Sequence, residues 1–206
     1  MSRITVYHGS SVEVKQPSLN YGRYDADFGV GFYVTQDHEM AEKWASLKKN
    51  SIVNVYELDL DCLNGIEFGL DKSWLDFIVQ NRSGNQRIDL DISDIDYITG
   101  ATADDRLFSV IEQYEDNLID VNSAIKAMNI MKIGTQICLC STHAISAISF
   151  ISSHTISNER KAELAVIRKQ VRKETNHIVE NILQEKVKRE NEKNGPIPIV
   201  HRGRSR

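Results

Sequence analysis

The segment Asp27-Phe-Gly-Val-Gly-Phe-Tyr-Val-Thr35 sets the expected fold around it. Two glycines precede a short strand over residues 31–35, and Asp37 is placed to cap a helix over about residues 38–49. The Gly-x-Gly pair does not follow a strand within a βαβ unit, so a Rossmann phosphate loop is not expected. The segment therefore predicts a glycine-containing turn, a strand and a helix in that order.

An earlier strand over residues 4–8 ends at a histidine and a glycine, in the run Tyr7-His8-Gly9-Ser10. A glycine at this point lets a ligand approach the backbone closely, and its N–H and C=O groups can bind an amide. The alternative is an ordinary exit from a strand into a turn. These four residues are the first candidates for a binding site.

Further along, the chain mixes strand and helix patterns. Alternation predicts a central strand over residues 51–60 and another strand over residues 135–141, in which Gln136 shares one face with Cys138 and Cys140. More strands are expected over residues 66–68, 96–100 and 150–156. More helices are expected from Asp71 or Ser73 to about residue 81, over residues 103–114 and 121–131, and from residue 142. This order predicts an α+β domain over residues 1–156.

The C-terminal region has a different pattern, that of one long helix over residues 157–194. Its apolar stripe consists of Leu164, Ile167, Val171, Ile178 and Ile182. At about 1.5 Å per residue the helix spans roughly 50 Å, so its distal half is expected to project from the domain and to meet a second copy or a dedicated protein partner. Residues 195–206 are expected to form a flexible basic tail.

The net charge of −4 hides an asymmetry along the chain. Residues 1–150 hold 12 Lys or Arg against 22 Asp or Glu, whereas residues 151–206 hold 13 against 7. A solvated helix and tail would explain this balance. The alternative is that the basic C-terminal region contacts RNA, DNA or an acidic partner.

Composition excludes several classes of protein. Hydrophobic residues make up 41% of the chain and charged residues 26%, which is typical of a soluble globular domain. No apolar run approaches about eighteen residues and no signal peptide is seen, so no membrane contact and a cytoplasmic location are expected. Three cysteines and six histidines show no metal-ligand spacing, so no metal site is expected.

The motifs together resemble a known superfamily. His-Gly-Ser on a first strand, Gly-x-Gly-Phe-Tyr on a second and Ala-x-x-Trp on a helix resemble the ADP-ribosyltransferase fold of the diphtheria-toxin and poly(ADP-ribose) polymerase type. More closely, the chain resembles a bacterial family of unknown function placed in that superfamily, on residues 7–10, 27–35, 100–105 and 136–144. The resemblance implies two small packed sheets with a cleft between them, surrounding helices, and NAD⁺ as a substrate.

The resemblance also implies roles for single residues. His8 would hydrogen-bond a hydroxyl of the nicotinamide ribose, the backbone of Gly9 would hold the nicotinamide carboxamide, and Ser10 would lie near the adenosine ribose. Tyr33 would stack on the nicotinamide ring, and Trp44 would form the opposite wall.

Arg23 and Gln136 complete the expected site. Arg23 is a candidate partner for the phosphates, with a solvated loop arginine as the alternative. Gln136 stands where the superfamily normally has an acid, and an amide supplies neither negative charge nor a general base. Chain elongation is therefore disfavoured, and Gln136→Glu is expected to add the missing charge. Other acids that could supply it, or that merely cap helices and lie on the surface, are Asp104, Asp105, Glu112 and Glu115.

These features predict a mono-ADP-ribosyltransferase that transfers ADP-ribose from NAD⁺ to a macromolecular acceptor. Compact bacterial transferases of this kind often act as toxins, which implies a neutralising protein partner. One alternative is a catalytically weak nucleotide-binding or protein-interaction module of the same fold, with Gln136 marking lost catalysis. Another alternative, suggested by the basic tail, is an enzyme that acts on nucleic acid.

Overall fold

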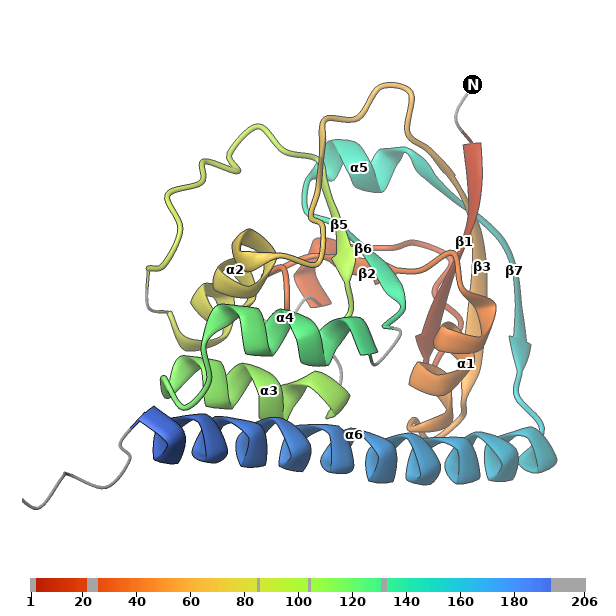
Figure 1. Ribbon diagram of the computed structural model, residues 1–206. Coiled ribbons are helices and arrows are strands. Elements are labelled where there is room, and N and C mark those ends of the chain that lie inside the picture. The colour runs from red at the N-terminus through yellow and green to blue at the C-terminus, as the bar shows by residue number, and fades with distance from the viewer. Residues whose placement is uncertain (1–2, 22–25, 85, 104, 131–132, 194–206) are drawn as a thin grey trace, which may run out of the picture.

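The structure is a computed structural model that describes residues 3–21, 26–84, 86–103, 105–130 and 133–193 (Figure 1). It is an α+β protein with two sheets, in agreement with the predicted class. The strands are β1 (Arg3–Ser10), β2 (Phe32–Val34), β3 (Ile52–Asp59), β4 (Gly65–Glu67), β5 (Tyr97–Ala101), β6 (Thr135–Leu139) and β7 (Ile148–Thr155). The helices are the 3-10 helix η1 (Leu19–Tyr21), α1 (His38–Ser46), α2 (Lys72–Ser83), α3 (Asp105–Glu115), α4 (Val121–Ile130), α5 (Thr142–Ser146) and α6 (Asn158–Lys193).

The two sheets differ in size and strand direction. The smaller sheet has three antiparallel strands in the order β1-β3-β7, which confirms the predicted central position of β3. The larger sheet has the order β2-β6-β5-β4, in which only β4 and β5 run parallel. A single bridge between Tyr7 and Thr35 joins β1 to the residue that follows β2.

The sheets pack face to face and are covered by helices on their outer sides. Val6 and Tyr56 of the smaller sheet meet Phe32 and Leu139 of the larger sheet in one buried cluster. Helices α2, α3 and α4 build a second cluster around Trp74 on the far face of the larger sheet. Helix α1 covers the outer face of the smaller sheet. Because side chains alternate across a strand, β2 and β6 contribute to both clusters.

Helices α1 and α2 each begin at an aspartate that satisfies an N–H group of the first turn. Asp37 accepts a hydrogen bond from the N–H of Met40 at 3.2 Å, which confirms the predicted cap of α1. Asp71 accepts from the N–H of Trp74 at 3.0 Å at the start of α2. Helix α2 ends at Gly84, whose φ of 73° lies in the left-handed region that glycine adopts without steric cost.

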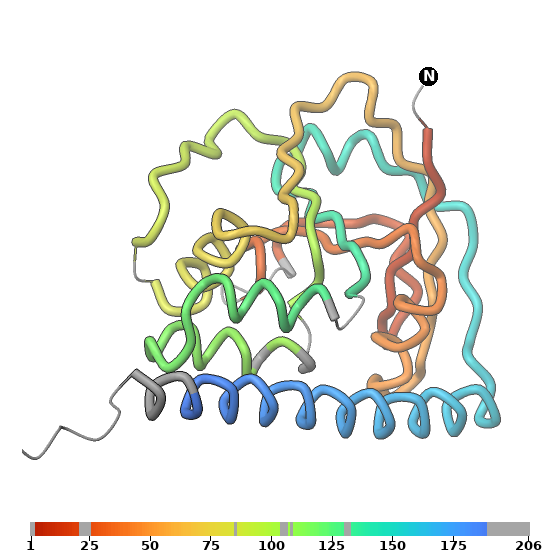
Figure 2. The backbone as a smooth tube through the Cα atoms, viewed as in Figure 1, coloured from red at the N-terminus to blue at the C-terminus, as the bar shows by residue number. Residues whose placement is uncertain are grey.

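Helix α6 has the predicted bounds, but the expectation that its distal half projects from the domain is wrong. It runs along the whole width of the molecule, past α1 and then past α3 and α4 (Figures 1 and 2). Thr175 at the middle of the helix and Val179 in its distal half are buried, and Glu185 forms an ion pair with Lys126 of α4 at 3.3 Å. The physical reason is that α3 and α4 extend the domain sideways, so the apolar stripe finds cover beyond α1.

Burial on α6 allows a stability test. Leu164 is fully buried, whereas Val166 on the same helix is 69% exposed. We expect Leu164→Ala to lower the free energy of unfolding by about 3 kcal/mol, because the mutation leaves a cavity. The matched substitution Val166→Ala should change it by less than about 0.5 kcal/mol. Urea denaturation of both variants measures the difference, and equal effects would mean that α6 does not pack on the domain in solution.

Candidate functional site

The candidate site begins where β1 and β2 separate. The N–H and C=O groups of Tyr7 both bond to Thr35, at 2.8 and 3.0 Å, so they point away from β3. Since hydrogen-bonded and non-bonded residues alternate along an antiparallel strand, the same groups of Gly9 also point away from β3. If the ladder continued, Gly9 would pair with Tyr33, but the only bridge between these segments is the one at Tyr7.

The side chain of His8 takes the place of the missing ladder bond. Its Nδ1 lies 2.7 Å from the carbonyl oxygen of Tyr33, the group that a continued ladder would offer to the N–H of Gly9. A carbonyl only accepts, so Nδ1 carries the proton and donates. Burial lowers the pKa of His8 below its ordinary value of 6.5, which leaves Nε2 unprotonated as an acceptor near neutral pH. The imidazole also packs on Phe32, with ring centroids 4.5 Å apart.

Gly9 combines close packing against α1 with peptide groups that have no partner strand on one side in the described part of the chain. A Cβ atom here would lie 2.3 Å from the carbonyl oxygen of Ala41 and 2.8 Å from Cβ of Trp44, so α1 can pack on β1 only over a glycine. On the edge of the strand, the N–H and C=O groups of Gly9 have no hydrogen-bond partner among the described residues outside the small sheet. Gly9 is buried beneath α1, and this peptide edge, with Trp44 beside it, offers one hydrogen-bond donor and one acceptor.

Ser10 and Tyr33 both make local hydrogen bonds. The hydroxyl of Ser10 accepts from the N–H of Val12 at 3.2 Å. The hydroxyl of Tyr33 accepts from the N–H of Phe28 at 2.9 Å and donates to the carbonyl of Gly29 at 2.7 Å. Burial raises the pKa of Tyr33, so this hydroxyl stays protonated and holds the turn in front of β2. The role of each residue toward NAD⁺ stays a prediction.

Gln136 belongs to a buried polar network centred on Asp27. Its Nε2 donates to Oδ2 of Asp27 at 2.7 Å, and the N–H of Ala103 donates to the same oxygen at 2.8 Å. Arg82 of α2 donates to Oδ1 of Asp27 at 2.6 Å and to the carbonyl of Ala103. Gln136 itself is 4% exposed. The network therefore links the turn before β2 with α2, β6 and the segment that precedes α3.

This network changes the expectation for Gln136→Glu. A glutamate here would face the carboxylate of Asp27 at hydrogen-bond distance in a buried place, where two like charges repel strongly. One of the two acids would take up a proton or the local structure would move, so the substitution would not simply add a negative charge. Asp27 does not supply that charge either, because the guanidinium of Arg82 neutralises it.

Other candidates lie apart from this cluster or outside the described residues. Arg23 and Asp104 lie outside the described residues, as does the side chain of Asp105. Glu112 is exposed and Glu115 is half-buried on α3. Sequence reasoning gave no role to two members of the network. Asp27 is a charged residue close to the two glycines before β2, and this position was a sequence signal for a buried polar contact. No pattern in the sequence around Arg82 indicated its role.

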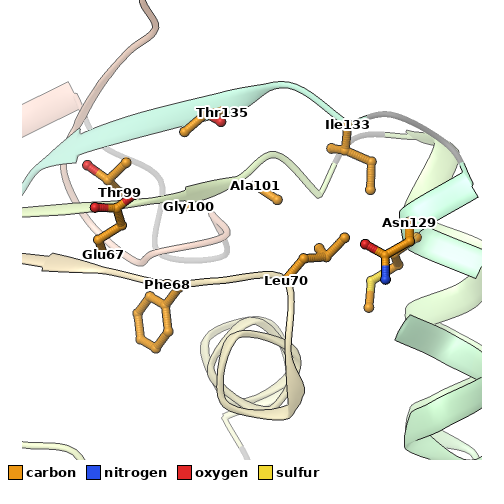
Figure 3. A pocket seen from close by; sticks show the side chains of 10 residues that line it. Glu67, Phe68, Leu70, Thr99, Gly100, Ala101, Asn129, Ile133 and Thr135 are labelled. Carbon is orange, nitrogen blue, oxygen red and sulfur yellow. The ribbon is translucent and has the colours of Figure 1, made fainter. Parts of the chain in front are cut away.

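A separate pocket of about 310 Å³ lies at the ends of β4, β5 and β6 (Figure 3). Its wall includes Glu67 and Thr99 at one end, and the side chains of Leu70, Asn129 and Ile133 converge at the other. His8, Tyr33 and Gln136 do not line it. Within the described part of the chain, no cluster of three or more His, Cys, Asp or Glu could hold a metal ion.

Fold and site together define an α+β protein whose two packed sheets separate beside a histidine and a free glycine peptide edge. The chain belongs to the family described as protein of unknown function DUF3990, whose model matches residues 4–150. Helix α6 lies beyond the matched residues. No curated protein and no solved structure matches the chain. Among the helices of the described residues, none has the length and apolar character needed to cross a membrane.

The charge at Asp27 can be tested by an isosteric change. Asp27→Asn should lower the free energy of unfolding by about 3 kcal/mol, because it leaves the mostly buried Arg82 guanidinium beside a neutral group. Glu185→Gln, which removes the charge of an exposed ion pair with Lys126, should cost less than about 1 kcal/mol. Chemical denaturation measures both, and an equal, small cost would show that the network does not stabilise the fold.

The lowered pKa of His8 predicts a pH dependence of stability. The unfolded chain binds a proton at His8 below about pH 6.5, whereas the folded chain resists it, so the free energy of unfolding falls as the pH drops below this value. The slope from this group is at most about 1.4 kcal/mol per pH unit. We expect His8→Asn to remove this contribution to the pH dependence of the free energy of unfolding between about pH 6.5 and 5. Urea denaturation of the parent and the variant at a series of pH values measures it. Parallel curves for the parent and the variant would contradict the lowered pKa.

Proposed function

We propose that the chain is a mono-ADP-ribosyltransferase that uses NAD⁺ as its substrate and modifies a macromolecular acceptor. The observation that carries the proposal is the free peptide edge of Gly9 at the separation of β1 and β2. The nicotinamide carboxamide has one acceptor and an N–H₂ donor, and it complements a peptide N–H and C=O in the way that a neighbouring strand would. The motif resemblance at His8, Gly9 and Tyr33 supports the same ligand.

His8 is suited to the neighbouring ribose. Its Nδ1–H is held by the Tyr33 carbonyl, so the ring orientation is fixed and the neutral Nε2 is left to accept a hydrogen bond. A ribose hydroxyl that donates to Nε2 would meet a ring whose orientation is already fixed. Such preorganisation lowers the entropic cost of bringing the reacting atoms together.

In the proposed transfer the C1′–N bond between the ribose and nicotinamide breaks, and its electron pair leaves with nicotinamide. A nucleophilic oxygen or nitrogen of the acceptor forms the new bond to C1′ and loses a proton. The positive charge that develops on the ribose needs a nearby acid, but Gln136 is neutral and Asp27 is paired with Arg82. This favours transfer of a single unit to an acceptor that brings its own nucleophile and base.

A second candidate function follows from the same network. A catalytically weak nucleotide-binding or protein-interaction module would keep the free edge of Gly9 and the fixed His8 while lacking an exposed acid near the ribose. The buried, neutral environment of Gln136 favours this alternative. Expected roles as a toxin with a neutralising partner, and a cytoplasmic location, remain predictions from the sequence.

The test is incubation of the full chain with NAD⁺ labelled on its adenosine, with and without a cell lysate. We expect label on macromolecules, and His8→Ala should reduce the rate ten- to a hundredfold, equivalent to about 1.4–2.8 kcal/mol of barrier. His177→Ala, the same change at an exposed position of α6, should leave the rate unchanged. Binding of NAD⁺ without turnover would support the binding module, and no binding at all would exclude both functions.

A further inference from the structure

Basic residues of two distant segments flank a contact between the end of α1 and α6. The guanidinium of Arg168 on α6 donates to the hydroxyl of Ser46 at 2.9 Å, which holds this part of α6 against the end of α1. Two lysines follow directly in the chain after α1, and three further basic residues lie within about two helical turns of Arg168. We call this set the basic patch, which consists of Lys48, Lys49, Arg168, Lys169, Arg172 and Lys173.

The patch is exposed and little neutralised. Arg168 is half-buried and its other five members are exposed. No Asp or Glu occurs in residues 43–56 or in residues 164–173. The nearest acid in the α6 sequence, Glu174, accepts a hydrogen bond from Gln170 at 2.8 Å. Because residues 1–150 carry an excess of acids, this concentration of positive charge is a local feature of the surface.

Hydrogen bonds hold the loop of Lys48 and Lys49 next to the segment that follows Gly9. Asn50, which follows the two lysines, donates to the carbonyl of Ser11 at 3.0 Å, and Ser10 pairs with Ile52. The loop that carries Lys48 and Lys49 therefore packs against the turn that follows Gly9. The charge of Lys48 also lies near enough to His8 to contribute to lowering its pKa. A polyanion bound at these two lysines would lie next to the site.

The chemistry of the patch fits phosphates better than a protein surface. Protein interfaces are depleted in lysine and contain a desolvated apolar centre. Here four of six side chains are lysines, and Val171, the aliphatic residue between the basic positions of α6, is half-buried. Surfaces that bind nucleic acid gain affinity mainly by releasing counterions when Lys and Arg meet phosphates.

We propose that the basic patch docks a nucleic acid strand, and, resting on the proposed function, that this nucleic acid is the acceptor of ADP-ribose. A nucleophilic oxygen or nitrogen of the docked strand attacks C1′ of the nicotinamide ribose and releases its proton. Nicotinamide leaves with the electron pair of the broken bond. The proposal replaces the expected protein partner of a projecting helix, because α6 does not project.

Docking is measured on the full chain without NAD⁺, by fluorescence anisotropy with labelled single-stranded and duplex DNA and RNA oligonucleotides. If all six charges meet phosphates, log K should fall against log salt with a slope of about −4 for single strands and about −5 for a duplex. The double variant Lys49→Ala/Lys173→Ala should lose at least tenfold in affinity at low salt and reduce the slope by about 1.5. Its matched control is Lys15→Ala/Lys188→Ala, which removes two exposed lysines elsewhere and should retain affinity.

Several outcomes would overturn the docking proposal. These are equal affinity losses in the patch and control variants, no salt-dependent binding, and binding to anionic lipid vesicles without binding to oligonucleotides. Circular dichroism and thermal melting of both double variants separate lost docking from lost folding. These substitutions affect exposed side chains, so the fold should persist.

The acceptor step is tested separately by adding adenosine-labelled NAD⁺ to the complex. Label on the oligonucleotide, reduced at least tenfold in the patch variant, supports the proposal. Label on protein alone, in a lysate that also contains the oligonucleotide, overturns the assignment of the acceptor. If the oligonucleotide binds through the patch but NAD⁺ is neither bound nor cleaved, the proposed function fails while docking stands.

Discussion

Where β1 separates from β2, Nδ1 of His8 donates a hydrogen bond to the carbonyl of Tyr33. The antiparallel bridge between Tyr7 and Thr35 could be extended, because each further pair of residues would add hydrogen bonds. The imidazole takes the acceptor that the next pair would need. Gly9, buried beneath α1, therefore has no strand partner on this side within the described chain, next to two sheets whose inner faces are packed together.

A second constraint is the carboxylate of Asp27, which holds four segments together from within. Donors from β6, α2 and the segment before α3 all meet at its two oxygens. A buried hydrogen-bonded network of this kind rigidifies its surroundings, and its ion pair leaves little free charge. The contacts that stabilise the turn before β2 thus also pair the charge of Asp27 with that of Arg82. This side of the site therefore offers no unpaired negative charge from its described residues to a bound ligand.

Helix α6 joins the two halves of the molecule. Near its start, Arg160 pairs with Glu42 of α1 at 2.7 Å, and further on it packs on α3 and α4 (Figure 2). The helix therefore contacts the helical layers on both outer faces of the sheet pair. Between these contacts it carries most of the basic patch, so the family-matched core and the helix beyond it jointly form the surface beside the candidate site.

Local sequence determined the order of strands and helices well, because alternation, aspartate caps and the absence of Gly and Pro act over a few neighbouring residues. The bounds of α6, the cap at Asp37 and the two faces of β6 follow from such short-range rules. The candidate pair of His8 and Gly9 was visible for the same reason, since a glycine that ends a strand is a local signal.

Only the tertiary structure decided the partners of these residues. The pairing of Gln136 with Asp27 spans 109 positions, and that of Arg168 with Ser46 spans 122, so no local pattern encodes either. The predicted length of α6 is confirmed. Whether its distal half projects from the domain depended on the positions of α3 and α4, which no local pattern gives. Contacts between distant segments are set by the packing of whole layers, and this packing turned a predicted projection into a helix that spans the domain.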